Sequence, residues 1–134
     1  MAKILRFSRD ERTARAGRWV RYRDDIDLRI ASTALTDWQN AYRDAVRIER
    51  EASRGEPNLD DAFLARQARI IATHLLKDWR NVEAEDGSPL AYTVDEATRL
   101  LADPGMTDLR VFVLRTANED EAFQRRNTEA ALGN

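Results

Sequence analysis

The chain has 134 residues, of which 43% are hydrophobic and 34% are charged, and its formal net charge is −2. A chain of this length can bury a core without disulfides, so we expect one domain over residues 1–134. The absence of cysteine, with a single histidine, excludes disulfides and the usual zinc ligand sets. No apolar run is long enough to span a membrane, and no apolar signal segment follows the first residues. These features predict a cytoplasmic protein.

The charge is unevenly distributed along the chain. In residues 1–23, eight basic side chains accompany only Asp10 and Glu11, so this part carries +6 and the remainder −8. Arginines recur every three residues from Arg6 to Arg21, a spacing that holds neither one helix face nor one side of a strand. A nucleic-acid-binding arm is one interpretation. We favour a second interpretation, in which residues 1–16 are a basic, mobile arm whose charge balances that of the acidic remainder. This arm is expected to be dispensable for folding.

A β-hairpin is predicted next, with strands at residues 17–23 and 26–31. In the second strand, apolar residues alternate with charged ones, which is the period of a half-buried strand: Ile26, Leu28 and Ile30. Trp19 is expected on the opposite face from these residues. A two-stranded hairpin alone is barely stable in water, so it needs a third strand or a helix. The segment 4–7 is one candidate for a third strand.

Two amphipathic helices should follow the hairpin and form an αα-hairpin. The first begins at a cap on Ser32 or Thr33 and ends near Ala52. Its apolar residues recur every three or four positions and form one stripe: Leu35, Trp38, Ala41, Tyr42, Ala45 and Ile48. After the break at residues 54–58, the second helix begins at Asn58 or Asp60. Its apolar residues also share one face: Leu64, Ala68, Ile71, Leu75 and Trp79. We therefore expect this helix to end at Trp79.

Two more helices complete the prediction. Thr93-x-x-Glu96 is a capping box, in which the threonine hydroxyl accepts from the Glu96 N–H and the glutamate reaches back. It begins a short helix over 94–102. Thr107 is expected to cap the last helix, which buries one face: Leu109, Phe112, Val113 and Thr116. Residues 118–134 are polar and predict a projecting or frayed end. The chain is thus an α+β protein, mostly helical, with a β-hairpin (three-stranded if a partner strand exists) packed on about four helices.

No catalytic, cofactor or metal site is predicted. His74 lies beside the apolar stripe of its helix, which is typical of a packed or half-exposed histidine. The acidic turn that contains Glu83, Glu85 and Asp86 lacks the spacing of a calcium loop. No glycine-rich phosphate-binding loop is present. We therefore expect a protein that is not an enzyme and that binds a partner.

One ordered set of features lies between the second helix and the end of the third. A tryptophan is followed by an acidic turn, a proline–leucine–aromatic step and a helix that ends in two leucines: Trp79, Asp86, Gly87, Pro89, Leu90, Tyr92, Leu100 and Leu101. This order resembles the tail assembly chaperones of long-tailed bacteriophages. Trp19, before a charged turn, and Phe123, in the last helix, resemble further parts of that family.

The resemblance implies a chaperone that binds the tape measure protein, and with it tail tube subunits, in the host bacterial cytoplasm and is absent from the mature particle. In that family a longer form often arises by ribosomal slippage, and the codons of Leu132 to Asn134 can hold a slippery site. A frameshifted longer form of the chain is therefore a further expected partner. Separately, the chain is expected to be able to form a homo-oligomer. Two alternatives stay open: a nucleic-acid-binding regulator that uses the arginine-rich arm, and a structural tail or connector protein retained in the virion.

Overall fold

The computed structural model describes residues 15–52 and 61–132, and it describes side chains at 15–52 and 62–119. Its strands are β1 (Arg18–Arg21), β2 (Asp27–Ile30) and β3 (Leu76–Arg80). Its helices are α2 (Thr36–Ala52), α3 (Asp61–His74), α4 (Val94–Ala102) and α5 (Thr107–Leu132), with a short 3-10 helix, η1 (Pro104–Met106), before α5. The predicted α+β class, mostly helical, is confirmed. The candidate strand at 4–7, the start of the second helix at 58–60 and residues 133–134 lie outside the described residues.

The three strands form one antiparallel sheet in the order β1-β2-β3. The predicted hairpin is confirmed, with Val20 opposite Leu28 and a turn closed by a bond of 2.9 Å from the Tyr22 N–H to the Ile26 carbonyl. Leu28 in turn lies opposite Trp79 on β3. Apolar side chains from all three strands therefore share one face of the sheet, and this face packs against the helices.

The prediction that a helix continues to Trp79 was wrong. Helix α3 ends at His74, and the chain turns at Leu75 directly into β3. The helical spacing of apolar residues agrees with the structure only as far as Leu75. Beyond it, the free edge of β2 offers residues 76–80 a set of backbone hydrogen bonds. Pairing with this edge is favourable, because unpaired strand edges are unfavourable. Leu76 is fully buried at this junction. The third strand thus comes from the middle of the chain.

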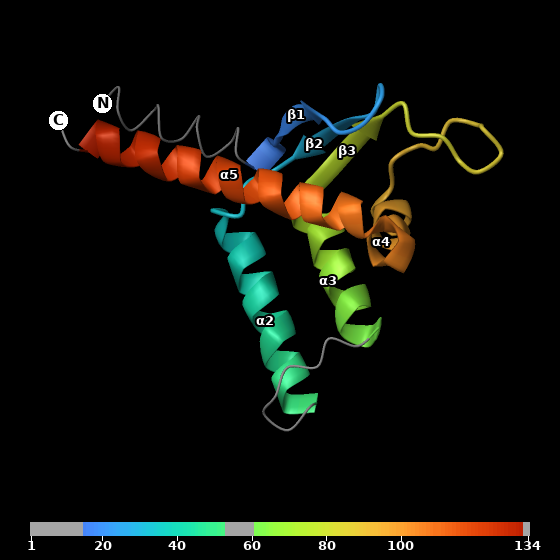
Figure 1. Cartoon of the computed structure of the whole chain (residues 1–134). Helices are drawn as coiled ribbons and strands as arrows, with labels where there is room; N and C mark the ends of the chain where they lie inside the picture. The colour runs from blue at the N-terminus through green and yellow to red at the C-terminus, as the bar shows by residue number, and fades with distance from the viewer. Residues whose placement is uncertain (1–14, 53–60, 133–134) are drawn as a thin grey trace.

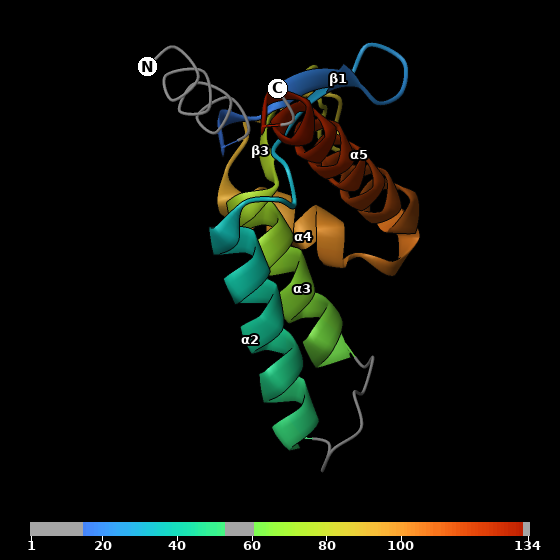
Figure 2. The same ribbon diagram turned by 90° about the vertical axis from the view of Figure 1, so that its left-hand side faces the viewer.

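The helices α2 and α3 confirm the predicted αα-hairpin, which projects from the sheet and α5 as an antiparallel pair (Figures 1 and 2). The start of α2 differs from the prediction, because it lies at Thr36. Ser32 instead makes a turn by accepting from the Ala34 N–H, and the Thr33 hydroxyl donates to Asn118 of α5 at 2.9 Å. Neither buried residue caps α2: Ser32 closes a local turn, and Thr33 binds the chain to α5.

The core lies where the sheet, α3, α4 and α5 meet. It contains aliphatic residues from each element, together with Trp38 and Trp79. Helix α5 crosses the body and extends beyond it (Figure 1), and its predicted face is buried at Leu109, Val113 and Thr116. Thr107 begins α5, but its hydroxyl donates to the Pro104 carbonyl at 2.9 Å instead of capping the helix. The preceding 3-10 turn brings that carbonyl within reach.

Gly17, just before β1, gives a first testable prediction. It has φ of +86°, and a Cβ atom there would lie 2.8 Å from the Ile30 carbonyl carbon. We expect Gly17→Ala to lower the free energy of unfolding by about 1–3 kcal/mol, through backbone strain and the clash. Gly87 is the control, since it has φ of +84° but open space around the added carbon. Urea melts should show the larger loss for Gly17→Ala, and equal losses would contradict a role for the contact with Ile30.

Candidate partner-binding surface

Three of the motif residues form a cluster that closes the body of the protein. The Trp79 indole N–H donates to the Leu90 carbonyl at 2.7 Å. The Tyr92 hydroxyl lies 2.6 Å from the Leu76 carbonyl and 3.0 Å from that of Ala72, at the junction of α3 and β3. The Trp79 and Tyr92 rings meet edge to face, with centroids 5.1 Å apart. Burial raises the pKa of Tyr92 above its ordinary value. This cluster is therefore structural, and it fixes the chain where it returns from the acidic turn.

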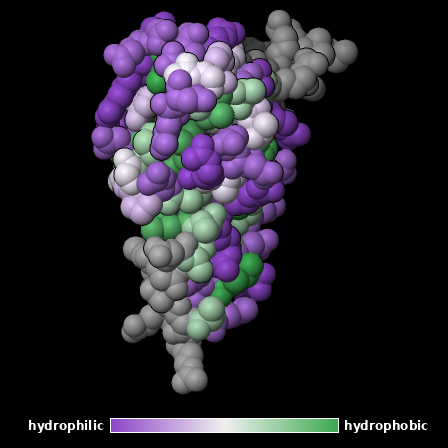
Figure 3. Space-filling view, turned by 90° about the vertical axis from the view of Figure 1, so that its right-hand side faces the viewer, coloured by the Kyte–Doolittle hydropathy of each residue, from purple (hydrophilic) through white to green (hydrophobic). Residues whose placement is uncertain are grey.

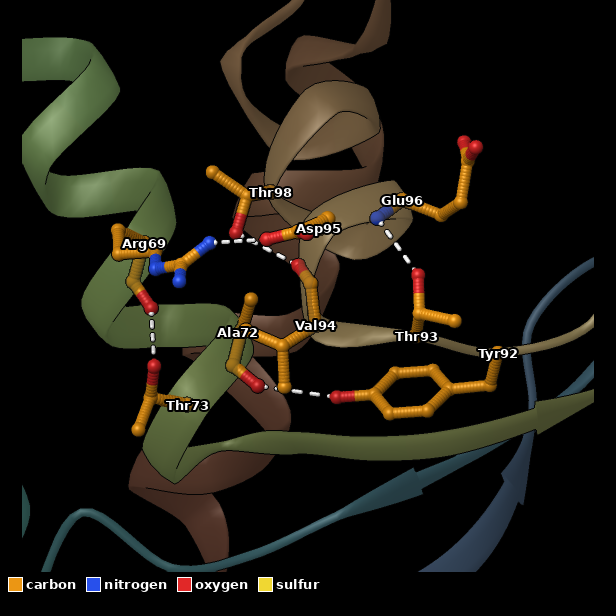
Figure 4. A network of polar contacts seen from close by, with 9 residues as sticks. All are labelled: Arg69, Ala72, Thr73, Tyr92, Thr93, Val94, Asp95, Glu96 and Thr98. Carbon is orange, nitrogen blue, oxygen red and sulfur yellow. Dashed lines mark hydrogen bonds and ion pairs between the residues drawn. The ribbon is translucent and has the colours of Figure 1, made fainter.

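Polar contacts then hold the start of α4 against α3 (Figure 4). The Thr93 hydroxyl accepts from the Glu96 N–H at 3.0 Å, as the capping box predicts. The Glu96 carboxylate does something else, since it accepts from the Arg99 guanidinium at 2.7 Å. Arg69 of α3 donates to Asp95 of α4 at 2.6 Å (Figure 4). The capped end of α4 is thus bound to α3, and Leu101 at its other end is fully buried while Leu100 is partly buried.

The acidic turn is the exposed part of the motif. It is a tight turn, in which Gly87 has positive φ and the Ala84 N–H donates to the Ser88 carbonyl at 2.8 Å. Asp86 accepts from both the N–H and the hydroxyl of Ser88, which lowers the pKa of its carboxyl. Pro89 is exposed at the base of this loop, which extends away from the sheet (Figure 1).

The remaining residues of the resemblance lie apart from this cluster. Trp19 is half-buried on the outer face of the sheet, opposite the core as predicted, and the Arg80 guanidinium carbon lies 3.7 Å from its ring centre. Phe123 lies in α5, beyond the last described side chain. His74 is partly buried at the end of α3, where burial and nearby Lys77 lower its pKa. The structure therefore does not bring Trp19 or His74 together with the motif.

The surface that sequence reasoning missed lies on α2. The predicted apolar stripe divides: Trp38 and Ala45 are buried, while Tyr42 is 39% exposed and Ile48 is 41% exposed. The stripe is only partly covered because α2 packs mainly on α3. Along one side of α2 runs an open groove of about 550 Å³, which we call the α2 groove: Trp38, Gln39, Tyr42, Arg43, Val46, Arg47, Arg50 and Glu51.

The α2 groove combines apolar and cationic side chains. The rings of Trp38 and Tyr42 stack with centroids 5.5 Å apart. Arg47 lies near Asp44 and Glu51, at 3.8 and 3.4 Å. Arg43 and Arg50 make no ion pair with any residue that the structure describes.

A buried ion pair holds α2 in place behind the groove. Glu49 is only 4% exposed and accepts from Arg66 of α3 at 2.9 Å. A buried carboxylate needs such a partner, because an unpaired buried charge is strongly unfavourable. Glu49 lies four residues after Ala45, on the face that the sequence predicts as apolar. A charged residue on that face was the one signal that the stripe does not pack as a uniform core.

Hydrophobic residues also reach the surface outside the α2 groove. Figure 3 shows one side of the molecule, where hydrophobic residues (green) form separate patches between hydrophilic ones (purple). A second shallow depression, of about 520 Å³, lies on α5 beside the half-exposed Val111. It lacks aromatic side chains, so the α2 groove is the better candidate for a partner.

Comparison with known families decides the broad origin of the chain. The family model of the YdaY prophage protein matches residues 32–134, which is 103 of the 134 residues. The chain belongs to the YdaY prophage protein family. The match to this family covers α2 to α5, and with them the α2 groove and the Trp79–Tyr92 cluster. No curated protein and no solved structure matches the chain.

Membership of this family makes the chain phage-related, which is the broader part of what the resemblance to tail assembly chaperones implies. The described helices include none that is long and apolar enough to cross a membrane.

Proposed function

We propose that this prophage protein is a tail assembly chaperone that binds the tape measure protein in the host cytoplasm and is absent from the finished particle. It acts by binding alone and catalyses no reaction. Tail tube subunits and a frameshifted longer form of the chain are its further partners, and it can work as a homo-oligomer. The proposal rests on the resemblance around Trp79 to Leu101, on the prophage family and on the α2 groove.

The α2 groove is the observation that carries the proposal. A tape measure protein is long and largely helical. Before the tail tube forms around it, the apolar stripe along its helix is exposed and can cause aggregation. A chaperone for such a chain needs a groove into which an amphipathic helix can lay its apolar face. Here Tyr42 and Val46 offer apolar surface that the fold itself leaves partly uncovered.

The motif residues support the proposal in a different way. Trp79, Leu90 and Tyr92 contact one another, so the ordered features that carry the resemblance form one structural unit. Resemblance in such a unit favours a shared fold. The exposed turn that contains Asp86 is then a second surface that a partner can reach.

Co-expression tests the proposed function. We expect the tape measure protein encoded by the same prophage to stay soluble when this chain is present and to co-elute with it. The proposal would be overturned if the tape measure protein aggregated both with and without this chain, while each protein was otherwise well folded.

The two alternatives predict other results. A nucleic-acid-binding regulator would bind DNA with an affinity that falls steeply with salt, by a slope of about −0.9 per phosphate contacted. A structural tail protein would be detected by mass spectrometry in purified particles, from which an assembly chaperone is missing.

A further inference from the structure

We propose that the α2 groove binds an amphipathic helix whose flanks are acidic. This inference rests on the proposed function only in taking the tape measure protein as the natural source of that helix. The binding chemistry follows from the side chains of α2 themselves.

The apolar part of the groove has the geometry of a helix-binding strip. Trp38, Tyr42 and Val46 follow one another at intervals of four residues, so they form one ridge along about 12 Å of α2. Ridges of this kind pack into the groove between ridges of another helix. Trp38 is only 7% exposed and stacks on Tyr42, so it supports the tyrosine ring and leaves that ring and Val46 as the contact surface.

The outer edge of the groove determines the charge of the partner. Arg43, Arg47 and Arg50 lie at intervals of four and three residues, on one edge of the same helix. The only acidic residue in the lining is Glu51, so the groove has a net positive charge. Arg43 and Arg50 have no ion-pair partner among the described residues. A helix with carboxylates beside its apolar stripe would supply these partners.

Two other occupants fit the same surface less well. A second copy of the chain would bring its own cationic edge against this one, and like charges across an interface are unfavourable. A nucleic acid would satisfy the arginines, but single-stranded nucleic acid binds by stacking its bases on exposed aromatic rings. Of the apolar side chains in the groove, Tyr42 alone exposes a ring, because Trp38 is covered and Val46 has none, so the groove could stack one base rather than a row of them. The combination favours an acidic helix.

Fluorescence anisotropy with a designed peptide tests this inference. The probe is a labelled helical peptide of roughly 20 residues, with leucine along one stripe and glutamate on both flanks. A matched peptide carries lysine in place of each glutamate. We expect the full-length protein to bind the glutamate peptide and not the lysine peptide, with weaker binding when salt rises from about 50 to 300 mM. Equal binding of both peptides, or of neither, overturns the inference.

Charge reversal on α2 locates the site. We expect Arg43→Glu to weaken binding of the glutamate peptide several-fold, and the double variant Arg43→Glu/Arg50→Glu by about tenfold or more. Arg115→Glu on α5 is the matched control, since Arg115 is also exposed, lies within a helix and has no ion pair with a described residue. It should leave binding nearly unchanged. If a double variant is poorly folded, Arg43→Gln/Arg50→Gln removes the same charges with good helix formers. Unchanged binding by folded variants overturns the inference.

The result separates this inference from the proposed function. If the tape measure protein stays soluble with the double variant as well as with the wild type, the chaperone function stands and the α2 groove is not its site. If the wild type binds the glutamate peptide but does not bind the tape measure protein, the groove takes an acidic helix from another source. Competition by a single-stranded oligonucleotide, or a peptide-independent dimer lost in the double variant, would assign the groove to the other occupants.

Discussion

Replacing Trp79 with alanine should lower the free energy of unfolding by about 3–5 kcal/mol, the range for a buried aromatic truncated to alanine. Trp79 is 7% exposed, lies beside Leu28 in the sheet and packs edge to face on Tyr92. The substitution leaves a cavity at the centre of β3 and removes the only indole N–H that reaches the Leu90 carbonyl. Urea denaturation followed by circular dichroism measures this loss.

A milder variant separates packing from hydrogen bonding. Trp79→Phe keeps a ring against Tyr92 but leaves the Leu90 carbonyl without its donor, so it should lose less than the alanine variant. A loss near zero for Trp79→Ala would contradict the buried position of Trp79 and make it a candidate for partner contact instead.

The paired leucines at the end of α4 give the second large effect. Leu101 is fully buried, and we expect Leu101→Ala to lose about 2–5 kcal/mol of unfolding free energy. Leu100 is only partly buried, so Leu100→Ala should lose clearly less. The two substitutions remove the same atoms from neighbouring positions, and helix propensity cancels between them. Chemical denaturation of both variants would contradict the described packing if their losses were equal or reversed.

Local chemistry in the sequence predicted several elements well. The alternation of Ile26, Leu28 and Ile30 indicated a half-buried strand, and the structure pairs this segment in the expected hairpin. Thr93 was predicted to cap α4 because a threonine hydroxyl can reach the N–H three residues on, and it does so. Both features depend on neighbours in the chain, so the sequence alone contains their physical cause.

Elements that depend on distant partners were harder to predict. Residues 76–80 form a strand because β2 has an edge to pair, and helical spacing through Leu75 conceals this. The Thr33 hydroxyl binds α5 rather than capping α2, because the fold places Asn118 beside it. The α2 groove was missed for the same reason. An apolar stripe shows that one face can be buried, but only the position of α3 decides how much of Tyr42 is covered.

The insertion of the αα-hairpin between β2 and β3 has a consequence for how the chain folds. Pairing β2 with β3 brings together segments that are nearly fifty residues apart, and contacts of such sequence separation usually slow folding. When α2 and α3 lie antiparallel, however, the start of α2 comes close to the end of α3, and the Ala31 N–H donates to the Leu75 carbonyl at 2.8 Å. Helices form faster than such long-range pairs. The helical hairpin therefore shortens the effective loop between β2 and β3. Once it has formed, the two strands are already close together, and only their register remains to be found.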